Sequence, residues 1–166
     1  YHRFFEILNY DCCKDYNSIE EYLKTSVAAG KISEEYAGLI NLKRFEEFLQ
    51  TDLGKRMGSA YKKGLLFREQ PFIMELGADM IDKEYPSDEK ILVQGIVDAF
   101  FFEDDKVYIV DYKTDRVEQG KAGEKALVER YHKQLELYAD TISRVTGKET
   151  GGCYIYSTCL KKEILI

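Results

Sequence analysis

The stretch Gln94–Arg116, QGIVDAFFFEDDKVYIVDYKTDR, decides the fold of this chain. It contains two runs of β-branched and aromatic residues, which suit the half-buried, pleated surface of a strand. The segment between the runs, from Glu103 to Lys106, is short and polar, as in a tight turn. The stretch therefore predicts a β-hairpin that turns at Asp104 and Asp105.

A two-residue loop at Asp104-Asp105 also determines which residues face each other across the hairpin, beginning with Glu103 and Lys106. Side chains two residues apart share one face of a strand, so the following pairs lie on the same side of the sheet. These expected pairs are Phe102–Val107, Phe100–Ile109, Asp98–Asp111 and Ile96–Lys113.

Two carboxylates, Asp98 and Asp111, stand out on this otherwise apolar face. Directly opposed residues have Cβ atoms roughly 5 Å apart, and like charges repel at that distance. A hard divalent cation such as Mg²⁺, held by one or two carboxylates and several waters, would compensate them. Lys113 on the same face would orient a water molecule and neutralise charge on a phosphate. The alternative is a register slip or a bulge, which would leave the two aspartates separately solvated.

The rest of the chain predicts helices first and strands later. Apolar spacings of three and four, with capping residues, predict helices at 1–10, 18–29, 42–49, 51–61 and 126–145, and a short helical turn from Ser33. Strands are expected at 65–76, in the hairpin, at 152–158 and at 162–166, with loops at 77–90 and 117–124. Pro71 removes a ladder donor, so strand 65–76 should lie at a sheet edge or carry a bulge.

The long helix at 126–145 lies between strands and predicts a crossover connection. Its apolar stripe, which would face the sheet, consists of Leu127, Tyr131, Leu135, Tyr138 and Ile142. The expected fold class is α/β (α+β), a small mixed β-sheet flanked by helices with an N-terminal helical segment. We expect a single domain over 1–166, with a helical portion at 1–64 and a core of sheet and crossover helix at 65–166.

Composition narrows the function classes. The net charge of −6 argues against a protein that grips nucleic acid over its whole surface, although a local basic channel is compatible with it. The cluster Lys55, Arg56, Lys62 and Lys63 fits either a solvated helix face or a phosphate contact.

The remaining compositional features concern compartment and completeness. The four cysteines contain no C-x-x-C pair, which favours a reducing cytoplasm over a disulfide framework, with an iron–sulfur site as the alternative. No apolar run approaches a membrane span. The chain starts at Tyr1 rather than Met and stops in an apolar run, so we expect a module of a larger protein.

Three ordered motifs carry a family resemblance. They are Gly95-Ile-Val-Asp98, Asp111-Tyr-Lys113-Thr-Asp and Gln134-x-x-x-Tyr138. In this order they resemble the RecB-type branch of the PD-(D/E)XK nuclease superfamily. The wording D-Y-K-T-D-R, preceded by V-Q-G-I-V-D, is most similar to the C-terminal nuclease domains of the AddA family of helicase–nuclease subunits. The resemblance extends from His2 to about Thr158. It implies a restriction-endonuclease-like core.

The resemblance implies roles for individual residues. The metal ligands would be His2, Asp98, Asp111 and the backbone carbonyl of Tyr112. From the pattern alone, His2 would be a polar surface residue at a helix end. Besides the two aspartates, the residues that act on the scissile phosphate or its water would be Lys113, Gln134 and Tyr138.

Two further site residues complete the set. Glu69 lies on the first expected strand, where many relatives of this family keep an acid; read from the pattern alone, it is either edge-exposed or a third acid of the site. Thr114, which follows Lys113 in the second motif, is the other additional candidate.

The resemblance also implies an activity with its cofactor and partners. The activity would be Mg²⁺-dependent exonuclease cleavage of single-stranded DNA during double-strand-break end processing, with Mn²⁺ as a substitute metal. No iron–sulfur cluster is expected. The partners would be a single-stranded DNA end, the helicase portion of the same polypeptide in an ATP-dependent complex, and an AddB-type partner subunit. The location would be the bacterial cytoplasm, with no membrane.

Three rival interpretations remain. A catalytically silent nuclease-fold domain would bind DNA or act as a scaffold, although the intact Asp98, Asp111 and Lys113 disfavour it. A stand-alone RecB/Cas4-like exonuclease is disfavoured by the missing cysteine pattern. A metal-binding interaction module without a nucleic-acid substrate would leave the Gln134-x-x-x-Tyr138 motif unexplained.

Overall fold

The structure is a computed structural model of the chain, and it describes residues 1–78, 84, 86 and 88–166. Five helices precede the sheet, and capping residues mark where several of them begin. Asp15 opens the second helix with a capping box, and the side chains of Ser33, Asn41 and Thr51 accept the first free N–H groups of the next three. The five are α1 (His2–Ile7), α2 (Tyr16–Ala28), α3 (Glu34–Gly38), α4 (Leu42–Gln50) and α5 (Asp52–Lys62).

The strands form one five-stranded mixed sheet in the order β1-β2-β3-β4-β5. They are β1 (Leu66–Gly77), β2 (Lys90–Glu103), β3 (Lys106–Lys113), β4 (Thr150–Ser157) and β5 (Lys162–Leu165). Only β3 and β4 pair in parallel; the other neighbours are antiparallel. A parallel pair needs a crossover, and α6 (Lys121–Thr146) supplies it. The expected mixed α/β fold with N-terminal helices is therefore confirmed.

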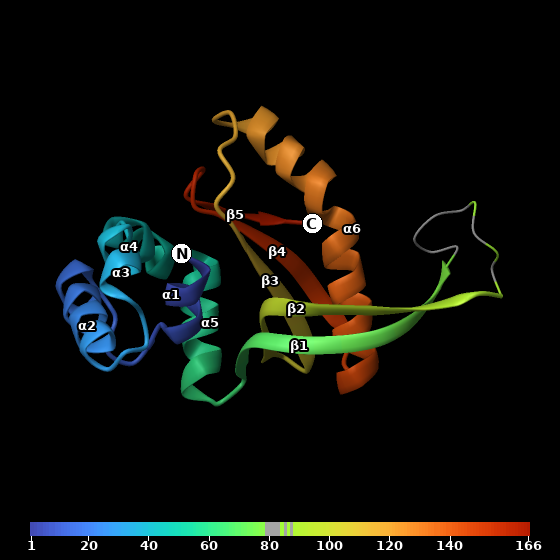
Figure 1. The fold of residues 1–166 in the computed structure, drawn as a ribbon, viewed down its shortest axis with the longest axis horizontal. Helices are drawn as coiled ribbons and strands as arrows, with labels where there is room; N and C mark the ends of the chain where they lie inside the picture. Colours follow the sequence, from blue (N-terminus) through green and yellow to red (C-terminus); the bar gives the residue numbers. More distant parts are fainter. Residues whose placement is uncertain (79–83, 85, 87) are drawn as a thin grey trace.

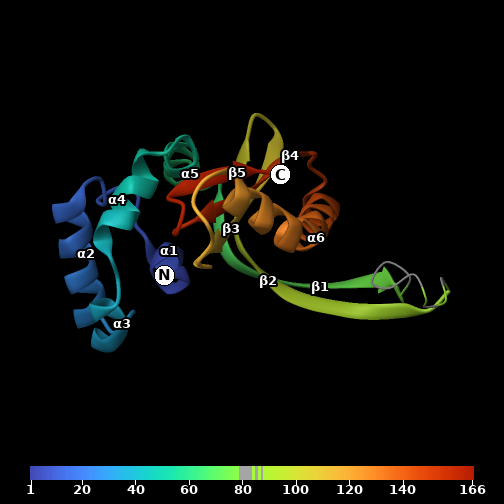
Figure 2. The ribbon, with the colours of Figure 1, turned by 90° about the horizontal axis from the view of Figure 1, so that it is seen from above.

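The sheet separates two layers of helices (Figures 1 and 2). The helical portion, α1 to α5, lies against one face and α6 against the other. The core on the helical side is rich in aromatic rings, whereas the core under α6 is mainly aliphatic. Four of the five residues in the predicted stripe of α6 are buried and the fifth, Tyr131, is partly buried.

The predicted register of the central hairpin is confirmed as far as Phe100. Glu103 pairs with Lys106 and Phe100 pairs with Ile109, on either side of a turn whose two residues, Asp104 and Asp105, both have positive φ. The ladder then ends at Ala99–Val110, one pair short of the predicted Asp98–Asp111 contact.

The predicted shared face is also wrong beyond Phe100, because the alternation of β2 changes phase at Asp98. Val97 and Phe100 both lie in the core under α6, although three positions separate them. Ile96, which was expected on that face, is half exposed. Opposite Asp98 on β1, Glu69 has a φ of 49°, a backbone conformation that few residues other than glycine adopt. Both strands are thus distorted at the same point.

The strands β1 and β2 extend past α6 as a two-stranded arm (Figure 1). β1 is an edge strand, as Pro71 predicted, since it pairs only with β2. The predicted loop at 77–90 is shorter, because Gly77 belongs to β1 and Lys90 to β2. Its residues 79–83, 85 and 87 lie outside the described part of the chain.

Two helix boundaries differ from the sequence prediction. The first helix ends at Ile7 rather than Tyr10. The helix expected at 126–145 begins at Lys121, because Gly120 and Gly123, which suggested a loop, serve its first turn. Gly123 packs so closely against the Glu118 carbonyl that a Cβ there would lie 1.9 Å from its oxygen. Tertiary contact, not local flexibility, requires this glycine.

Candidate active site

Asp98 ends the pairing of β2 with β3. Its Oδ2 accepts a hydrogen bond of 2.8 Å from the backbone N–H of Tyr112, a strand donor that here binds a side chain. This bond explains why the ladder ends at Ala99–Val110 rather than continuing through Asp98 and Asp111. It also holds the carboxylate beside the peptide that links Asp111 to Tyr112.

His2 reaches the same point from α1. Its Nε2 lies 2.6 Å from the carbonyl oxygen of Tyr112 and 3.5 Å from Oδ2 of Asp98. The histidine side chain is 45% exposed and the aspartate side chain 16% exposed, so the group opens to solvent on the histidine side. Residues 110 positions apart in the chain are thereby brought together.

Asp111 and Lys113 lie on the α6 side of β3 as a buried ion pair. Lys113 Nζ is 2.6 Å from Asp111 Oδ2, and the two side chains are 14% and 2% exposed. Burial raises the pKa of Asp111 to about 6; the nearby Asp98 carboxylate adds to the increase, and Lys113 opposes it. The same Oδ2 atom is buried without a well-aligned hydrogen bond. Asp111 therefore has an oxygen that could bind a cation.

Gln134 and Tyr138 on α6 extend this pair. Lys113 Nζ donates to Gln134 Oε1 at 3.2 Å, and Gln134 Nε2 donates to the Tyr138 hydroxyl at 2.7 Å. Burial raises the pKa of Tyr138, and the negative charges of Asp111 and Asp98 contribute to the increase. The structure thus joins the second and third motifs in one hydrogen-bonded chain.

A second set of contacts on Lys113 was not expected from the sequence. Its Nζ lies 4.0 Å from the centre of the Tyr131 ring, a cation–π contact. The Tyr131 hydroxyl and Arg130 Nη1 both donate to Oδ1 of Asp115, at 2.9 and 2.7 Å. Asp115 stands in the second motif and Tyr131 one turn before Gln134. This spacing was the available signal.

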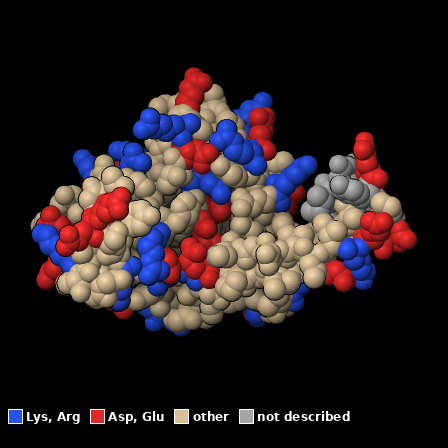
Figure 3. Space-filling view, in the orientation of Figure 1, with Lys and Arg blue, Asp and Glu red and all other residues tan. Residues whose placement is uncertain are grey.

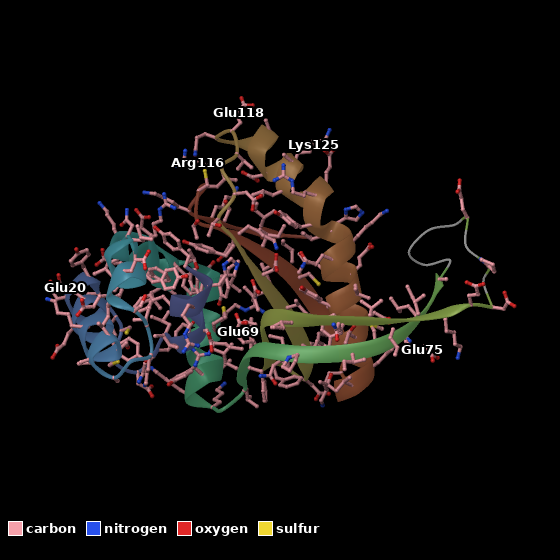
Figure 4. The ribbon with its side chains drawn as sticks, in the orientation of Figure 1. Glu20, Glu69, Glu75, Arg116, Glu118 and Lys125 are labelled. Atoms are coloured by element: carbon pink, nitrogen blue, oxygen red, sulfur yellow. The ribbon has the colours of Figure 1, made fainter. Side chains whose placement is uncertain are left out.

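Glu69 lies close to these residues at the start of the arm (Figure 4). Burial raises its pKa, and the neighbouring charges of Asp98 and Glu6 raise it further, while His2 and Arg3 oppose them. Glu69 is therefore a third acid near the site. In Figure 3, acidic side chains gather in the hollow between the helical portion and the arm.

Thr114 lies apart from the ion pair. It is exposed, and it lines a cavity with Arg44 and Arg116 beyond the end of β3. Arg56 of the basic cluster is already occupied, since it is ion-paired with Glu103 at 2.6 Å and lies 4.2 Å from the centre of the Tyr108 ring. Its contact is structural.

The donor set suits a hard divalent cation. It combines an imidazole nitrogen, a backbone carbonyl oxygen and two carboxylates, the mixture of oxygen and nitrogen ligands that Mg²⁺ and Mn²⁺ accept. Within residues 1–78, 84, 86 and 88–166, no group of three or more His, Cys, Asp and Glu side chains converges closely enough to hold a metal. The arrangement depends on the Tyr112 carbonyl and on Asp111, which is paired here with Lys113.

Comparison with known families decides the classification. The model of the PD-(D/E)XK nuclease superfamily matches residues 2–163. The chain belongs to the PD-(D/E)XK nuclease superfamily. The matched range of this PD-(D/E)XK domain includes all three motifs and the α1 histidine, and so every site residue discussed above.

Individual relatives share a printed name, that of an ATP-dependent helicase/nuclease subunit. The chain is similar to this subunit from Clostridium perfringens strain SM101, with 40% identity over 89% of this chain and 12% of the relative. The corresponding protein from Listeria monocytogenes serotype 4a is 31% identical over 93% of the chain and 13% of the relative. The one from Lachnoclostridium phytofermentans is 30% identical over 100% of the chain and 14% of the relative. The PD-(D/E)XK domain thus spans about an eighth of the length of these bacterial relatives.

None of the helices in the described part of the chain combines the length and apolarity that a membrane crossing requires.

Proposed function

We propose that this PD-(D/E)XK domain is a Mg²⁺-dependent deoxyribonuclease that hydrolyses phosphodiester bonds of single-stranded DNA. The observation that carries the proposal is the meeting of His2 Nε2, the Tyr112 carbonyl oxygen and the Asp98 carboxylate beside the buried Asp111–Lys113 pair. A site with ligands for a hard cation and an ammonium group at its edge suits a substrate whose transition state carries extra negative charge.

The proposed metal ligands are His2, Asp98, Asp111 and the Tyr112 carbonyl. A divalent ion bound there would polarise the phosphate and lower the pKa of a bound water. Asp111 would release Lys113 on taking up the metal, because one carboxylate oxygen now serves the ammonium group. The buried oxygen without an aligned hydrogen bond is consistent with this exchange of partners.

The protein groups around Lys113 position the reactants. The ammonium group can donate hydrogen bonds to the attacking water and to a non-bridging phosphate oxygen. Gln134 and the Tyr131 ring hold Nζ from two sides, at 3.2 and 4.0 Å. Tyr138, through Gln134, fixes which amide group faces the lysine. These contacts align the lysine before the substrate arrives.

The substrate and the setting follow from the relatives. Their names combine a helicase with a nuclease in one polypeptide. A helicase separates strands, so a nuclease in the same polypeptide meets a single-stranded end. We therefore assign exonuclease action during double-strand-break processing, within an ATP-dependent bacterial enzyme in the cytoplasm that also contains an AddB-type partner subunit.

The experiment is Mg²⁺-dependent degradation of end-labelled single-stranded DNA by the chain. We expect Asp111→Asn and Lys113→Ala to lower the rate by roughly 10²–10³-fold or more, since each removes a group that acts on the developing charge. The matched control is Asp105→Asn, the same substitution in the exposed turn of the same hairpin, where asparagine tolerates a positive φ. It should cut at the wild-type rate.

Each outcome separates two interpretations. Cleavage by all variants would mean that the site is misassigned. Cleavage by none, with Mn²⁺ binding detected by calorimetry in wild type and lost in Asp111→Asn, would indicate a domain that needs its helicase. Absence of both cleavage and metal binding would support a silent scaffold. Chelation with EDTA should stop wild-type cleavage, and Mn²⁺ should restore it.

A further inference from the structure

A basic cavity of about 570 Å³ lies beyond the end of β3, next to the residues proposed for catalysis. Its volume falls in the range of about 300–1,000 Å³ that is typical of ligand sites. The described residues that line it supply two guanidinium groups and no carboxylate, although the chain as a whole carries a net charge of −6. These lining residues are Tyr1, Arg44, Thr114, Arg116, Val117 and Cys159.

Arg44 is held in place by groups that leave most of its donors free. Its guanidinium lies 5.5 Å from the centre of the Tyr1 ring, and its Nη1 donates to the Thr158 hydroxyl at 3.4 Å. Thr158 is buried, and its backbone N–H donates to the Lys113 carbonyl at 2.9 Å. The arginine is therefore connected to the strand end that presents Lys113 to the site.

Arg116 lies on the other side of Thr114, in the segment that leads from β3 to α6 (Figure 4). It is exposed, and among the residues that the structure describes neither Arg116 nor Arg44 takes part in an ion pair with a carboxylate. Arg130, by contrast, lies 2.7 Å from Asp115. The two arginines of the cavity thus retain their charge and donors for an external anion.

We infer that this cavity binds the backbone phosphate of the single strand adjacent to the scissile bond, through Arg44 and Arg116. A planar guanidinium binds phosphate through two parallel hydrogen bonds, and Thr114 adds a hydroxyl at the cavity wall. Because Thr114 directly follows Lys113, a strand held here continues into the proposed catalytic site. The inference rests on the proposed function, since it names where that substrate is held.

Binding of a labelled single-stranded oligonucleotide, measured by fluorescence anisotropy in EDTA at low ionic strength, tests the inference without cleavage. Arg116→Ala and Arg44→Ala should each weaken binding roughly tenfold. Each should also reduce the slope of log affinity against log salt by roughly 0.7, the value for one phosphate contact on a single strand. Arg116→Lys should restore the slope.

The matched control is Lys24→Ala, which removes one exposed charge on α2, where Lys24 is paired with Glu20 at the far end of the helical portion. Its affinity should equal that of wild type. Unchanged affinity and slope in Arg116→Ala would overturn the inference, even if Arg44→Ala misfolds. So would an absence of wild-type binding at low ionic strength.

Cysteine alkylation supplies an independent readout in the unmodified chain. Cys159 lines the cavity, while Cys12 is exposed elsewhere and serves as an internal control. A saturating oligonucleotide should slow modification of Cys159 several-fold and leave Cys12 unchanged. Equal rates at Cys159 with and without DNA would contradict the inference.

Failure of this inference is distinguishable from failure of the proposed function. Asp111→Asn should bind the oligonucleotide like wild type while losing cleavage. If Asp111→Asn cleaves normally, the catalytic assignment is wrong, whereas the binding result in EDTA still decides the role of the cavity.

Discussion

Neighbouring residues on β3 meet two different environments on the two faces of the sheet. Tyr112 points into the helical side, where its ring stacks on Phe5 with centroids 3.9 Å apart and an angle of 5° between the planes. Asp111 and Lys113 point to the α6 side, where they form an almost completely buried ion pair. The helical face is therefore packed for stability, whereas the α6 face contains charges that packing alone does not favour.

The difference teaches where the fold carries its function. Removing a carboxylate and an ammonium from water costs more than a nearby ion pair returns, unless other groups satisfy both partners. Here burial has raised the pKa of Asp111 to about 6. An apolar pair would stabilise the same position better, so the ionic pair is explained by the proposed chemistry and not by stability.

The largest expected effect is on the helical face. Phe5 is buried against Tyr112, Phe45, Phe48 and Tyr156. Phe5→Ala should lower the free energy of unfolding by about 3–5 kcal/mol, because it removes a buried ring and leaves a cavity. Urea denaturation measures this loss. Phe67→Ala is the control: Phe67 is 37% exposed on the edge strand, so its loss should be clearly smaller. Equal losses would break the comparison.

The next effect has the opposite sign and lies on the α6 face. Without metal, Asp111→Asn should raise the free energy of unfolding at pH 7.5 by on the order of 2 kcal/mol, since it removes a buried negative charge. The folded pKa of about 6 exceeds the ordinary value of 3.8, so wild-type stability should fall as the pH rises from about 4 through 6. The variant should lack this fall.

Thermal denaturation in EDTA across this pH range measures the difference between the two proteins. The gain should vanish near pH 4, where Asp111 is protonated in wild type as well. Asp105→Asn should change nothing. A destabilised Asp111→Asn protein would show that the Lys113 pair contributes net stability, contrary to the comparison.

Tyr131 offers a smaller effect on activity. Tyr131→Leu removes the ring next to Lys113 Nζ and should lower kcat by roughly tenfold, the equivalent of a partly buried cation–π contact, with little change in KM. Tyr131→Phe retains the ring but loses the hydrogen bond to Asp115, so its kcat should lie between the two. A KM effect in place of a kcat effect would mean that Tyr131 contacts DNA instead of positioning the lysine.

The smallest expected effect concerns Tyr112 itself. Its proposed role at the site uses the backbone carbonyl, while its hydroxyl lies on the opposite face, 3.9 Å from the sulfur of Met57. Tyr112→Phe should therefore change stability by less than about 1 kcal/mol and leave cleavage at the wild-type rate. A large loss of cleavage would mean that the two faces of β3 are coupled through this side chain.

Much of the sheet could be predicted from local sequence. The polar segment at Asp104-Asp105 set the hairpin turn, and the alternation of apolar residues set the pairing through Phe100. Pro71 placed its strand at the edge of the sheet, because a proline cannot donate to a second neighbour. Asn41 and Thr51 marked helix starts through hydrogen bonds within one turn. All of these signals act over a few residues.

The details of the site could not be predicted in the same way. The hairpin pattern indicated an Asp98–Asp111 pair, but the Asp98 side chain instead binds the Tyr112 N–H and ends the ladder. Periodicity alone placed His2 on the surface, and only the family resemblance associated it with the site. Tyr131 was expected to be core, yet its ring lies against Lys113.

The sequence by itself determined the turn, the strand faces near the turn, the crossover helix and the three motifs, because each depends on neighbours within one turn or one strand pair. The tertiary structure decided that α1 brings His2 to the Tyr112 carbonyl, that α6 brings Gln134 and Tyr131 to Lys113, and that Arg44 and Arg116 share one cavity. These contacts join segments far apart in the chain. They depend on how the helices pack on the two faces of the sheet, which no local pattern specifies.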